Sequence, residues 1–298
     1  MLELASQIFQ IMFPIIAIIL IGVLTGRRQH LDFESANQVN LSIFIPALVF
    51  ASLSQESFDF YSHSILALCG LLLVGLTAIV AMPTARASGI EYKSIAPPLM
   101  FHNAGNVGLP LFALALGPEG LAAGLVLFLV GNIAHFGLGS YMLDQKAHLL
   151  RSIAQPAILA AGLAFLIRYS PWTPPEYVML PIEMLGNIAV PLMLFSLGLR
   201  LAQSSLDDWQ SGLLVGVLTP IIGASLAALL LYWFHLPAYQ AAALLLFGAL
   251  PPAVMNYLFA ERYQQEPQRV SAMVLFGNVC GVISLPIALS YVLPRLPY

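Results

Sequence analysis

The chain repeats one order of sequence features about 146 residues apart, and this repeat limits the folds that it can adopt. Gly131-Asn132 follows the apolar run Leu-Phe-Leu-Val, and Gly277-Asn278 follows the similar run Met-Val-Leu-Phe. Pro46 likewise recurs as Pro191, and both are expected to kink a helix. Sequence that recurs at a fixed interval usually encodes a repeated structural unit. We therefore expect two related halves with their elements in the same order.

The composition places this repeat in a membrane. The chain is 59% hydrophobic and 8% charged, whereas soluble domains carry about 25% charged residues. Apolar runs close to the roughly 20 residues that cross a bilayer occur along its whole length. They predict an all-α membrane protein with ten transmembrane helices, at about residues 6–25, 37–54, 62–84, 94–116, 119–141, 154–169, 178–200, 211–234, 238–260 and 270–293.

The positive charges predict how these spans are oriented, because Lys and Arg are enriched in the cytoplasmic loops of membrane proteins. If the N-terminus lies outside, nine Lys and Arg residues fall in inner loops, and only Arg168 and Arg295 fall in outer ones. Both termini should then face outward. The nine inner residues are Arg27, Arg28, Arg86, Lys93, Lys146, Arg151, Arg200, Arg262 and Arg269.

Ten spans in two halves give five spans per half. Because five is odd, the second half enters the membrane from the opposite side, and the two repeats must be inverted. We expect an N-terminal five-helix repeat over residues 1–145 and a C-terminal inverted repeat over residues 150–298. In such a pair, broken helices from the two halves meet near the midplane of the membrane.

Two of the predicted spans contain residues that interrupt a helix. The fourth span carries Gly105 and Gly108, which relax the backbone, and Pro110, which has no N–H group. The corresponding part of the ninth span carries Pro251 and Pro252. Both halves are therefore predicted to break at matching places.

A broken helix at membrane depth is suited to binding an anion. Unwound backbone is tolerated there only when it packs in protein or lines a wet cavity, and the N-terminal helix ends present free N–H groups and a partial positive charge. Asn103, Asn106 and Asn256 add side-chain donors for a carboxylate. The alternative is that Gly and Pro are simply frequent in membrane helices and that Asn side chains hold helices together. Matched breaks in both halves favour the binding site.

Other polar residues at membrane depth allow two interpretations. His102 adjoins the broken segment, where it could handle a proton or an anion, or be a neutral imidazole bonded to a freed carbonyl. Asn132 and Asn278 occupy matched positions, where they could line the site or bond to freed carbonyls. His135 is assigned to helix packing.

Several classes of function are disfavoured. No Asp, Glu, Lys or Arg lies near the centre of a predicted span, although a proton/cation antiporter needs a carboxylate there. Motifs of zinc peptidases, serine hydrolases and phosphate-binding loops are missing, so no enzyme activity is expected. Cys69 and Cys280 lack metal-ligand spacing. No metal, cofactor or nucleic acid is expected, and the repeated, interrupted spans are typical of a secondary transporter.

Three stretches resemble the auxin efflux carrier family, whose bacterial members include carriers assigned to malate and malonate. Residues 103–111, Asn-Ala-Gly-Asn-Val-Gly-Leu-Pro-Leu, resemble the signature of its fourth span. Residues 251–263, Pro-Pro-Ala-Val-Met-Asn-Tyr-Leu-Phe-Ala-Glu-Arg-Tyr, resemble its ninth span. Residues 191–198, Pro-Leu-Met-Leu-Phe-Ser-Leu-Gly, resemble its seventh. The resemblance extends over essentially the whole chain.

The resemblance implies ten helices in two inverted repeats, similar to bile acid/sodium symporters, with crossed and broken helices 4 and 9 at the substrate site. It implies a scaffold domain from helices 1, 2, 6 and 7, often with homodimer contacts, and a transport domain from helices 3–5 and 8–10. The long cytosolic loop of the plant carriers is missing, because only residues 142–153 join the halves, and the chain is closer to the short prokaryotic members. Carried onto this chain, the crossover contains Asn103, Asn106, Pro110, Pro251, Pro252 and Asn256.

These observations predict a secondary transporter in a bacterial inner membrane that moves a small organic anion, such as malate, malonate or an auxin-like weak acid, by elevator-type alternating access. A sodium- or proton-coupled symporter of the same fold is the nearest alternative, because Asn side chains and free carbonyls can hold ions without an acid. A sensor that binds the ligand without moving it is a third possibility, and a channel is disfavoured because no ring of like charges is present.

Overall fold

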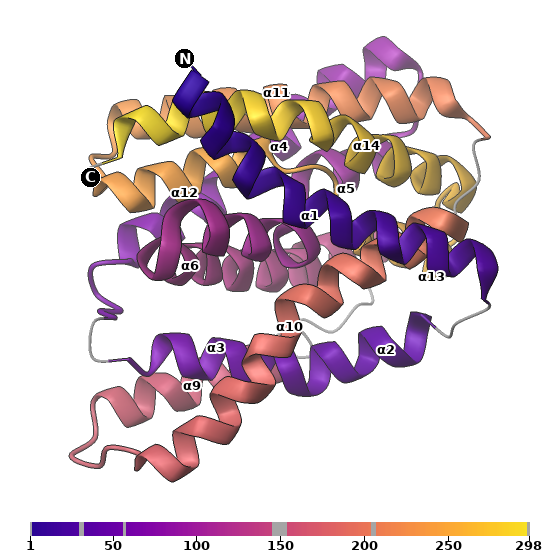
Figure 1. The fold of residues 1–298 in the computed structure, drawn as a ribbon. Helices are drawn as coiled ribbons and strands as arrows, with labels where there is room; N and C mark the ends of the chain where they lie inside the picture. The colour runs from indigo at the N-terminus through magenta and orange to yellow at the C-terminus, as the bar shows by residue number, and fades with distance from the viewer. Residues whose placement is uncertain (1, 30–32, 56–57, 145–153, 204–206, 297–298) are drawn as a thin grey trace.

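A computed structural model describes residues 2–29, 33–55, 58–144, 154–203 and 207–296, and over these ranges the chain is built from helices and short connections (Figure 1). Lys146, Arg151 and the predicted boundary between the repeats at residues 145–150 lie outside these ranges. The helices of the first half are α1 (Leu2–Arg28), α2 (Phe33–Val39), η1 (Asn40–Phe44), α3 (Ile45–Leu53), α4 (Ser64–Ser88), α5 (Tyr92–Met100), η2 (Ala104–Gly108), α6 (Leu109–Ala134), η3 (His135–Gly139) and α7 (Ser140–Leu143). Those of the second half are α9 (Pro156–Arg168), α10 (Glu176–Gln203), α11 (Trp209–Trp233), α12 (Ala238–Ala249), α13 (Met255–Arg262), α14 (Pro267–Val292) and η4 (Leu293–Arg295).

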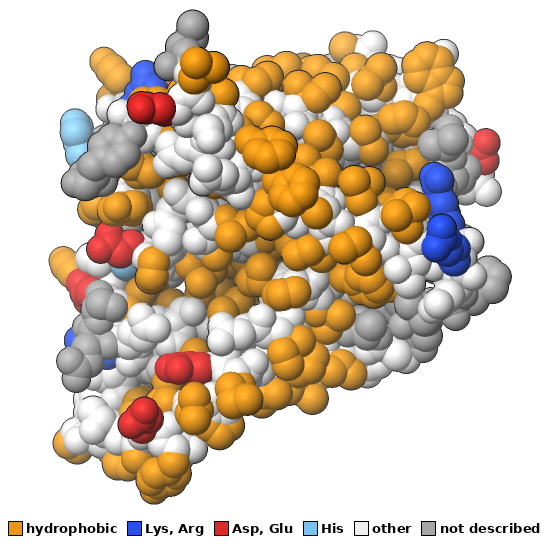
Figure 2. Space-filling model, in the orientation of Figure 1, with side chains coloured by type: hydrophobic (Ala, Val, Ile, Leu, Met, Phe, Trp, Pro, Cys, Tyr) orange, Lys and Arg blue, Asp and Glu red, His pale blue; other side chains and the backbone are white. Residues whose placement is uncertain are grey.

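Six helical segments in the described ranges are long and apolar enough to cross a membrane, so the chain is an integral membrane protein. They are Leu2–Arg28, Ser64–Ser88, Ala104–Leu143, Glu176–Ala202, Trp209–Trp233 and Pro267–Arg295. The surface agrees with this, because hydrophobic side chains cover the middle of the face in Figure 2, and charged side chains lie mainly toward its left and right ends. Shorter apolar helices occupy Asn37–Leu53, Pro156–Arg168 and Ala238–Ala249.

The longest of the six segments is interrupted at Gly117. This residue has φ 66° and ψ −160°, which lies outside the helical region, and Pro118 follows it. Glycine is the residue that adopts a positive φ without a steric penalty. Two separate spans were predicted at residues 94–116 and 119–141. The interruption falls between them, at the position where the sequence predicts a turn.

The helices pack into two groups. In the first group, α1 runs along α10, and α3 packs between α9 and α10. In the second group, α11 packs along α14 and against α12, while α4 packs on α5 and α6. In Figure 1, α3 and α9 lie in the lower part of the molecule, α11, α12 and α14 lie in the upper part, and α1 passes diagonally across the front. The broken segments lie where the two groups meet.

The kink predicted at Pro46 is preceded by a π-helical turn. The N–H of Ile45 donates to the carbonyl of Asn40, five residues back, instead of four. Pro46 then stands at the start of α3, inside the continuous helical stretch Asn37–Leu53. Such π-turns within helices frequently mark functional positions.

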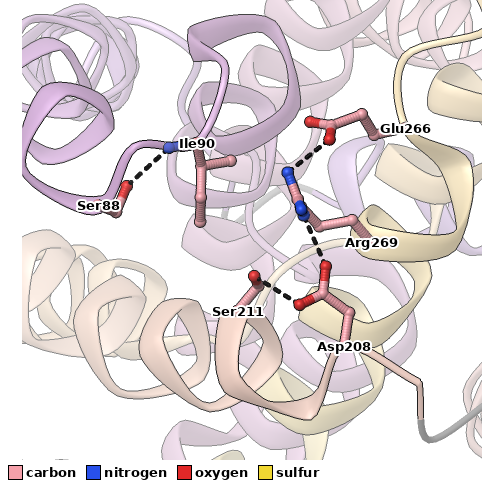
Figure 3. Close-up of polar contacts among 6 residues, drawn as sticks. All are labelled: Ser88, Ile90, Asp208, Ser211, Glu266 and Arg269. Carbon is pink, nitrogen blue, oxygen red and sulfur yellow. Dashed lines mark hydrogen bonds and ion pairs between the residues drawn. The ribbon is translucent and has the colours of Figure 1, made fainter.

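An ion-pair cluster joins the starts of α11 and α14 (Figure 3). Arg269 donates through Nε to Asp208 Oδ2 across 2.6 Å, and through Nη1 to Glu266. Asp208 also accepts a 2.8 Å bond from the hydroxyl of Ser211. Asp208 and Glu266 stand directly before the first residues of the two helices, so Arg269 fixes these two helix ends relative to one another.

Candidate functional site

Two helices end in the interior and resume a few residues later. α5 ends at Met100, Phe101 is extended with φ −107° and ψ 106°, and the chain becomes helical again at Ala104. α12 ends at Ala249, Leu250 is extended, and α13 begins at Met255. Both interruptions fall within the segments where the sequence predicts a break. The first lies upstream of Pro110, which stands at the start of α6, directly after η2.

The two interrupted segments pair with each other. The N–H of Asn103 donates to the carbonyl of Pro251 across 2.7 Å, and the N–H of Ala253 donates to the carbonyl of Phe101 across 2.9 Å. These two bonds form an isolated antiparallel bridge centred on His102 and Pro252. Backbone groups that leave a helix in an apolar interior must find new partners, and here each segment supplies them to the other.

Three asparagine side chains stabilise this pairing. Asn278 donates through Nδ2 to the carbonyls of Pro252 (3.1 Å) and Val274 (2.8 Å). Its Oδ1 accepts a 2.8 Å bond from Nδ2 of Asn103. Asn256 donates through Nδ2 to the carbonyl of Phe101 across 3.1 Å. All three side chains are buried, so these amides hold the unwound backbone in place.

The helix that follows the first break presents an uncapped N-terminus. The first N–H groups of a helix have no partner within it. Asn103, directly before η2, makes no side-chain hydrogen bond to them, because its amide points to Asn278. Gly105 and Asn106 in this first turn line a cavity. This helix end therefore offers N–H donors and a partial positive charge to an anion.

The cavity has a volume of about 80 Å³ and carries amide and imidazole groups on an otherwise apolar wall. Its walls come from α2, η1 and α3 of the first helix group, and from the second group's α4, α5, α6, α12, α13 and both interrupted segments. None of the polar residues that the structure describes in this wall is Asp, Glu, Lys or Arg. They are Asn37, His102, Asn103, Asn106, Asn132 and His135.

The two histidines are buried against aromatic rings. The ring of His135 stacks on Phe101 with centroids 4.1 Å apart and an interplanar angle of 7°, and it also contacts Phe259. His102 is 6% exposed, and its ring lies 5.3 Å from that of Phe247. Within the described residues, neither ring nitrogen of His102 has a hydrogen-bond partner, nor does Nε2 of His135. These nitrogens are buried, and Nε2 of His102 faces the backbone of α11 at Gly223.

The structure separates the predicted site residues into two sets. His102, Asn103, Gly105, Asn106 and Asn132 line the cavity. The other predicted residues hold or adjoin the break without lining the cavity; they are Gly108, Pro110, Pro251, Pro252, Asn256 and Asn278.

Two polar cavity residues are additional to the predicted set, Asn37 and His135. The polar Asn37 at the start of an apolar span was the available signal for the first. The signal for the second was a histidine within an apolar span, which was assigned to helix packing because its place in the cavity wall depends on the fold. In the described ranges, no group of three His, Cys, Asp or Glu side chains is arranged to hold a metal ion.

Comparison with known proteins places the chain in a family of transporters. Residues 141–289, half of the chain, match the family model described as membrane transport protein. A "Putative malonate transporter" of Rhizobium meliloti (strain 1021) is 26% identical over 94% of both chains. An "Uncharacterized transporter" of Methanothermobacter thermautotrophicus is 25% identical over 86% of this chain and 88% of that protein.

A plant relative is similar over a shorter part. "Auxin efflux carrier component 8" of Arabidopsis thaliana is 30% identical over 40% of this chain and 33% of its own length. This similarity agrees with the resemblance to auxin efflux carriers that the sequence motifs show. The chain therefore belongs to the membrane transport protein family, and it is a membrane transporter and not an enzyme.

Proposed function

We propose that this protein is a secondary transporter of a small organic anion, which binds in the cavity beside the paired helix breaks. The observation that supports this most directly is the uncapped start of η2, with Gly105 and Asn106 in the cavity wall. A carboxylate placed there accepts hydrogen bonds from backbone N–H groups and from the Asn106 amide. The helix end supplies positive potential without a buried Lys or Arg.

The cavity suits a small carboxylate better than a large one. At about 80 Å³ the cavity is small in this conformation, and it therefore favours a short organic anion over a bulky one. Asn132 offers a further side-chain donor on the same wall. One relative is named for malonate, a three-carbon dicarboxylate and thus a short organic anion. We therefore propose short dicarboxylates such as malonate and malate as the first substrates to test.

The proposed topology is ten spans in two inverted five-helix repeats, with the paired breaks as the crossover of helices 4 and 9. The first helix group, α1, α2, α3, α9 and α10, would be the scaffold domain. The second group, α4–α7 and α11–α14, would be the transport domain. The cavity supports this division, because Asn37, Leu41 and Ile45 come from the first group and the rest of its wall comes from the second. Movement of the second group against the first would carry the substrate across by an elevator mechanism.

The scaffold also offers a surface for a second copy of the chain. Leu159 and Leu166 on α9, and Leu180 and Met184 on α10, are each more than half exposed. In the proposed arrangement both termini face outward in a bacterial inner membrane, and homodimer contacts form through these helices.

Uptake into proteoliposomes tests the proposed function. Radiolabelled malonate and malate are offered with and without sodium, a proton gradient and an imposed membrane potential. We expect saturable uptake that follows the membrane potential alone, because the described residues of the cavity wall include no acid to bind a coupling cation. Uptake that requires sodium or a proton gradient would replace this proposal by a coupled symporter. Absence of saturable flux with folded protein would contradict transport of these anions.

The Asn106→Ala variant tests the site. We expect at least a tenfold loss of uptake, because a hydrogen bond to a charged group contributes about 1.5–3 kcal/mol. The melting temperature should remain unchanged, since no hydrogen bond from the Asn106 side chain to the described residues would be lost. The control is Thr84→Ala, which removes a hydroxyl bonded to the Val80 carbonyl away from the cavity. Full uptake by Asn106→Ala would place the substrate elsewhere.

A further inference from the structure

A second cavity lies on the other side of the helix breaks. It has a volume of about 420 Å³ and is enclosed by α1, α10 and α14. Met12, Ile19, Leu197 and Leu285 are among its walls, and Val107 and Pro251 reach it from the two broken segments. It is therefore about five times larger than the polar cavity, and it lies between the two helix groups.

The interior of this cavity offers nothing to a small hydrophilic ligand. Asn278 and Arg27 are the polar residues in its wall. The Asn278 amide is already engaged, because Nδ2 donates to two carbonyls and Oδ1 accepts from Asn103. Desolvating an anion beside a wall without free donors is unfavourable. A hydrocarbon chain meets no such penalty, and burying its CH₂ groups favours binding.

One charged side chain borders the cavity, at the end of α1. Arg27 lies in the last turn of this helix, at the side predicted to be cytoplasmic, and it is exposed. Within the described residues it forms no ion pair. Basic groups next to crevices between transmembrane helices on the cytoplasmic side are suited to acidic lipid headgroups.

The cavity borders surfaces that face the bilayer. Leu20 on α1 and Val279 and Val282 on α14 belong to its wall, yet 53%, 52% and 47% of these side chains are exposed. Each lies within a helix long enough to cross the membrane. Their exposed sides therefore face lipid, and a lipid chain reaches the cavity without crossing water.

We propose that this cavity binds one acyl chain of an anionic phospholipid, with the lipid phosphate paired to Arg27. The apolar wall accepts the chain, the exposed α1–α14 side admits it from the bilayer, and Arg27 selects for negative charge in the headgroup. The inference does not depend on which anion is transported. The chain would contact Val107 and Pro251, so the lipid would support the helix breaks from the side opposite the polar cavity.

Native mass spectrometry of the full-length protein in detergent tests this site. Delipidated protein is titrated with phosphatidylglycerol, with phosphatidylcholine of identical chains, and with oleate as a free fatty acid. We expect tighter binding of one phosphatidylglycerol molecule than of phosphatidylcholine. Arg27→Gln should weaken that binding about fivefold, the effect of one basic side chain at an anionic lipid surface. Arg28→Gln, which removes the neighbouring charge outside the cavity wall, should leave it unchanged.

A second pair of variants tests the acyl chain. Val282→Trp places an indole in the cavity and should abolish the tight phosphatidylglycerol site. Ile283→Trp adds the same group to a side chain that is 68% exposed and outside the wall, so it should retain the site. Equal binding of phosphatidylglycerol and phosphatidylcholine would overturn the proposal. So would equal effects of Arg27→Gln and Arg28→Gln, or of Val282→Trp and Ile283→Trp, on phosphatidylglycerol binding. Displacement of phosphatidylglycerol by oleate at equal affinity would replace the phospholipid by a free fatty acid.

Discussion

Asn103 donates a hydrogen bond from its side-chain amide to the side-chain oxygen of Asn278 across 2.8 Å, although the two residues are 175 positions apart in the chain. Asn278 is the repeat counterpart of Asn132, yet the two side chains lie in different environments. Asn278 bonds to backbone at the second break, whereas Asn132 lines the polar cavity. The two matched asparagines therefore divide between two environments, the helix break and the polar cavity.

This division predicts opposite phenotypes for one substitution at two matched positions. Asn278→Ala removes bonds to Asn103, Pro252 and Val274, and we expect it to lower the stability of the protein by about 1–3 kcal/mol. Asn132→Ala should change the melting temperature no more than a typical surface substitution does, and it should reduce anion uptake. Thermal unfolding and proteoliposome uptake are measured for both variants. Equal losses of stability would show that the two asparagines share one structural role.

The matched glycines beside them also differ. A Cβ atom on Gly277 would lie 2.4 Å from Cδ of Pro252, whereas one on Gly131 would first meet the ring of Phe247 at 3.5 Å, an ordinary contact. Gly277→Ala should therefore destabilise the protein by about 1–3 kcal/mol, the cost of overpacking. Gly131→Ala should not reduce the melting temperature, and it serves as the matched control. A Gly277→Ala protein as stable as the wild type would mean that the second break is free to shift.

The positions of the helices could be predicted from hydrophobic runs. The predicted span at residues 6–25 falls inside α1, the span at 62–84 overlaps α4, and the span at 211–234 overlaps α11. Apolar length is a property of the local sequence, so it is readable without a fold. The local sequence does not determine whether each of the shorter helices crosses the membrane. The apolar helices α9 and α12 are short, so their placement depends on the helices around them. The ten-span arrangement remains a prediction.

The Gly and Pro residues of the sequence were enough to locate the broken segments. They were not enough to predict which contacts each residue makes within them. Pro110 stands in the opening turn of α6, and the interruption lies upstream at Phe101–Asn103. Asn256 was expected to face a ligand, but its Nδ2 bonds to the Phe101 carbonyl. An amide can satisfy a ligand or a freed backbone carbonyl, and only the pairing of distant segments decides between them.

The cluster around Arg269 predicts a specific dependence of stability on pH. Burial raises the pKa of the Asp208 carboxyl, but hydrogen bonds from Arg269 and Ser211 and the charge of Arg269 lower it by more, so the net pKa lies below its usual value of 3.8. The folded state therefore gains stability from ionised Asp208. That gain is complete above pH 3.8 and is lost as the pH falls through the lowered pKa.

Melting temperatures of the wild type and Asp208→Asn at pH 7 and at about pH 3 check this dependence. At pH 7 we expect the variant to be less stable by about 0.2–1 kcal/mol, as for a partly exposed ion pair. The difference should shrink at the lower pH, where the wild-type carboxyl begins to protonate. Glu3→Gln, at an exposed glutamate near the start of α1, is the control for a general change in net charge. A difference that grows on acidification would contradict the assigned ion pair.

A contact between Arg200 and Tyr257 predicts how the two helix groups move. The guanidinium carbon of Arg200 on α10 lies 3.9 Å from the centroid of the Tyr257 ring on α13, and the Tyr257 hydroxyl donates to Glu261 across 2.8 Å. In the proposed elevator, α10 belongs to the scaffold and α13 to the moving domain. The contact would then form in only one of the two end conformations, and it stabilises the one described here.

Removing the ring should shift the population away from this conformation. A cation–π contact contributes about 0.5–1 kcal/mol at exposed sites, which corresponds to a shift of about two- to fivefold. We expect Tyr257→Leu to change the distance distribution between spin labels at Leu166 on α9 and Ile283 on α14. Tyr257→Phe, which keeps the ring and loses only the hydroxyl, should retain the wild-type distribution. Identical distributions in all three proteins would show that α10 and α13 do not separate during transport, and the assignment of α13 to a moving domain would fail.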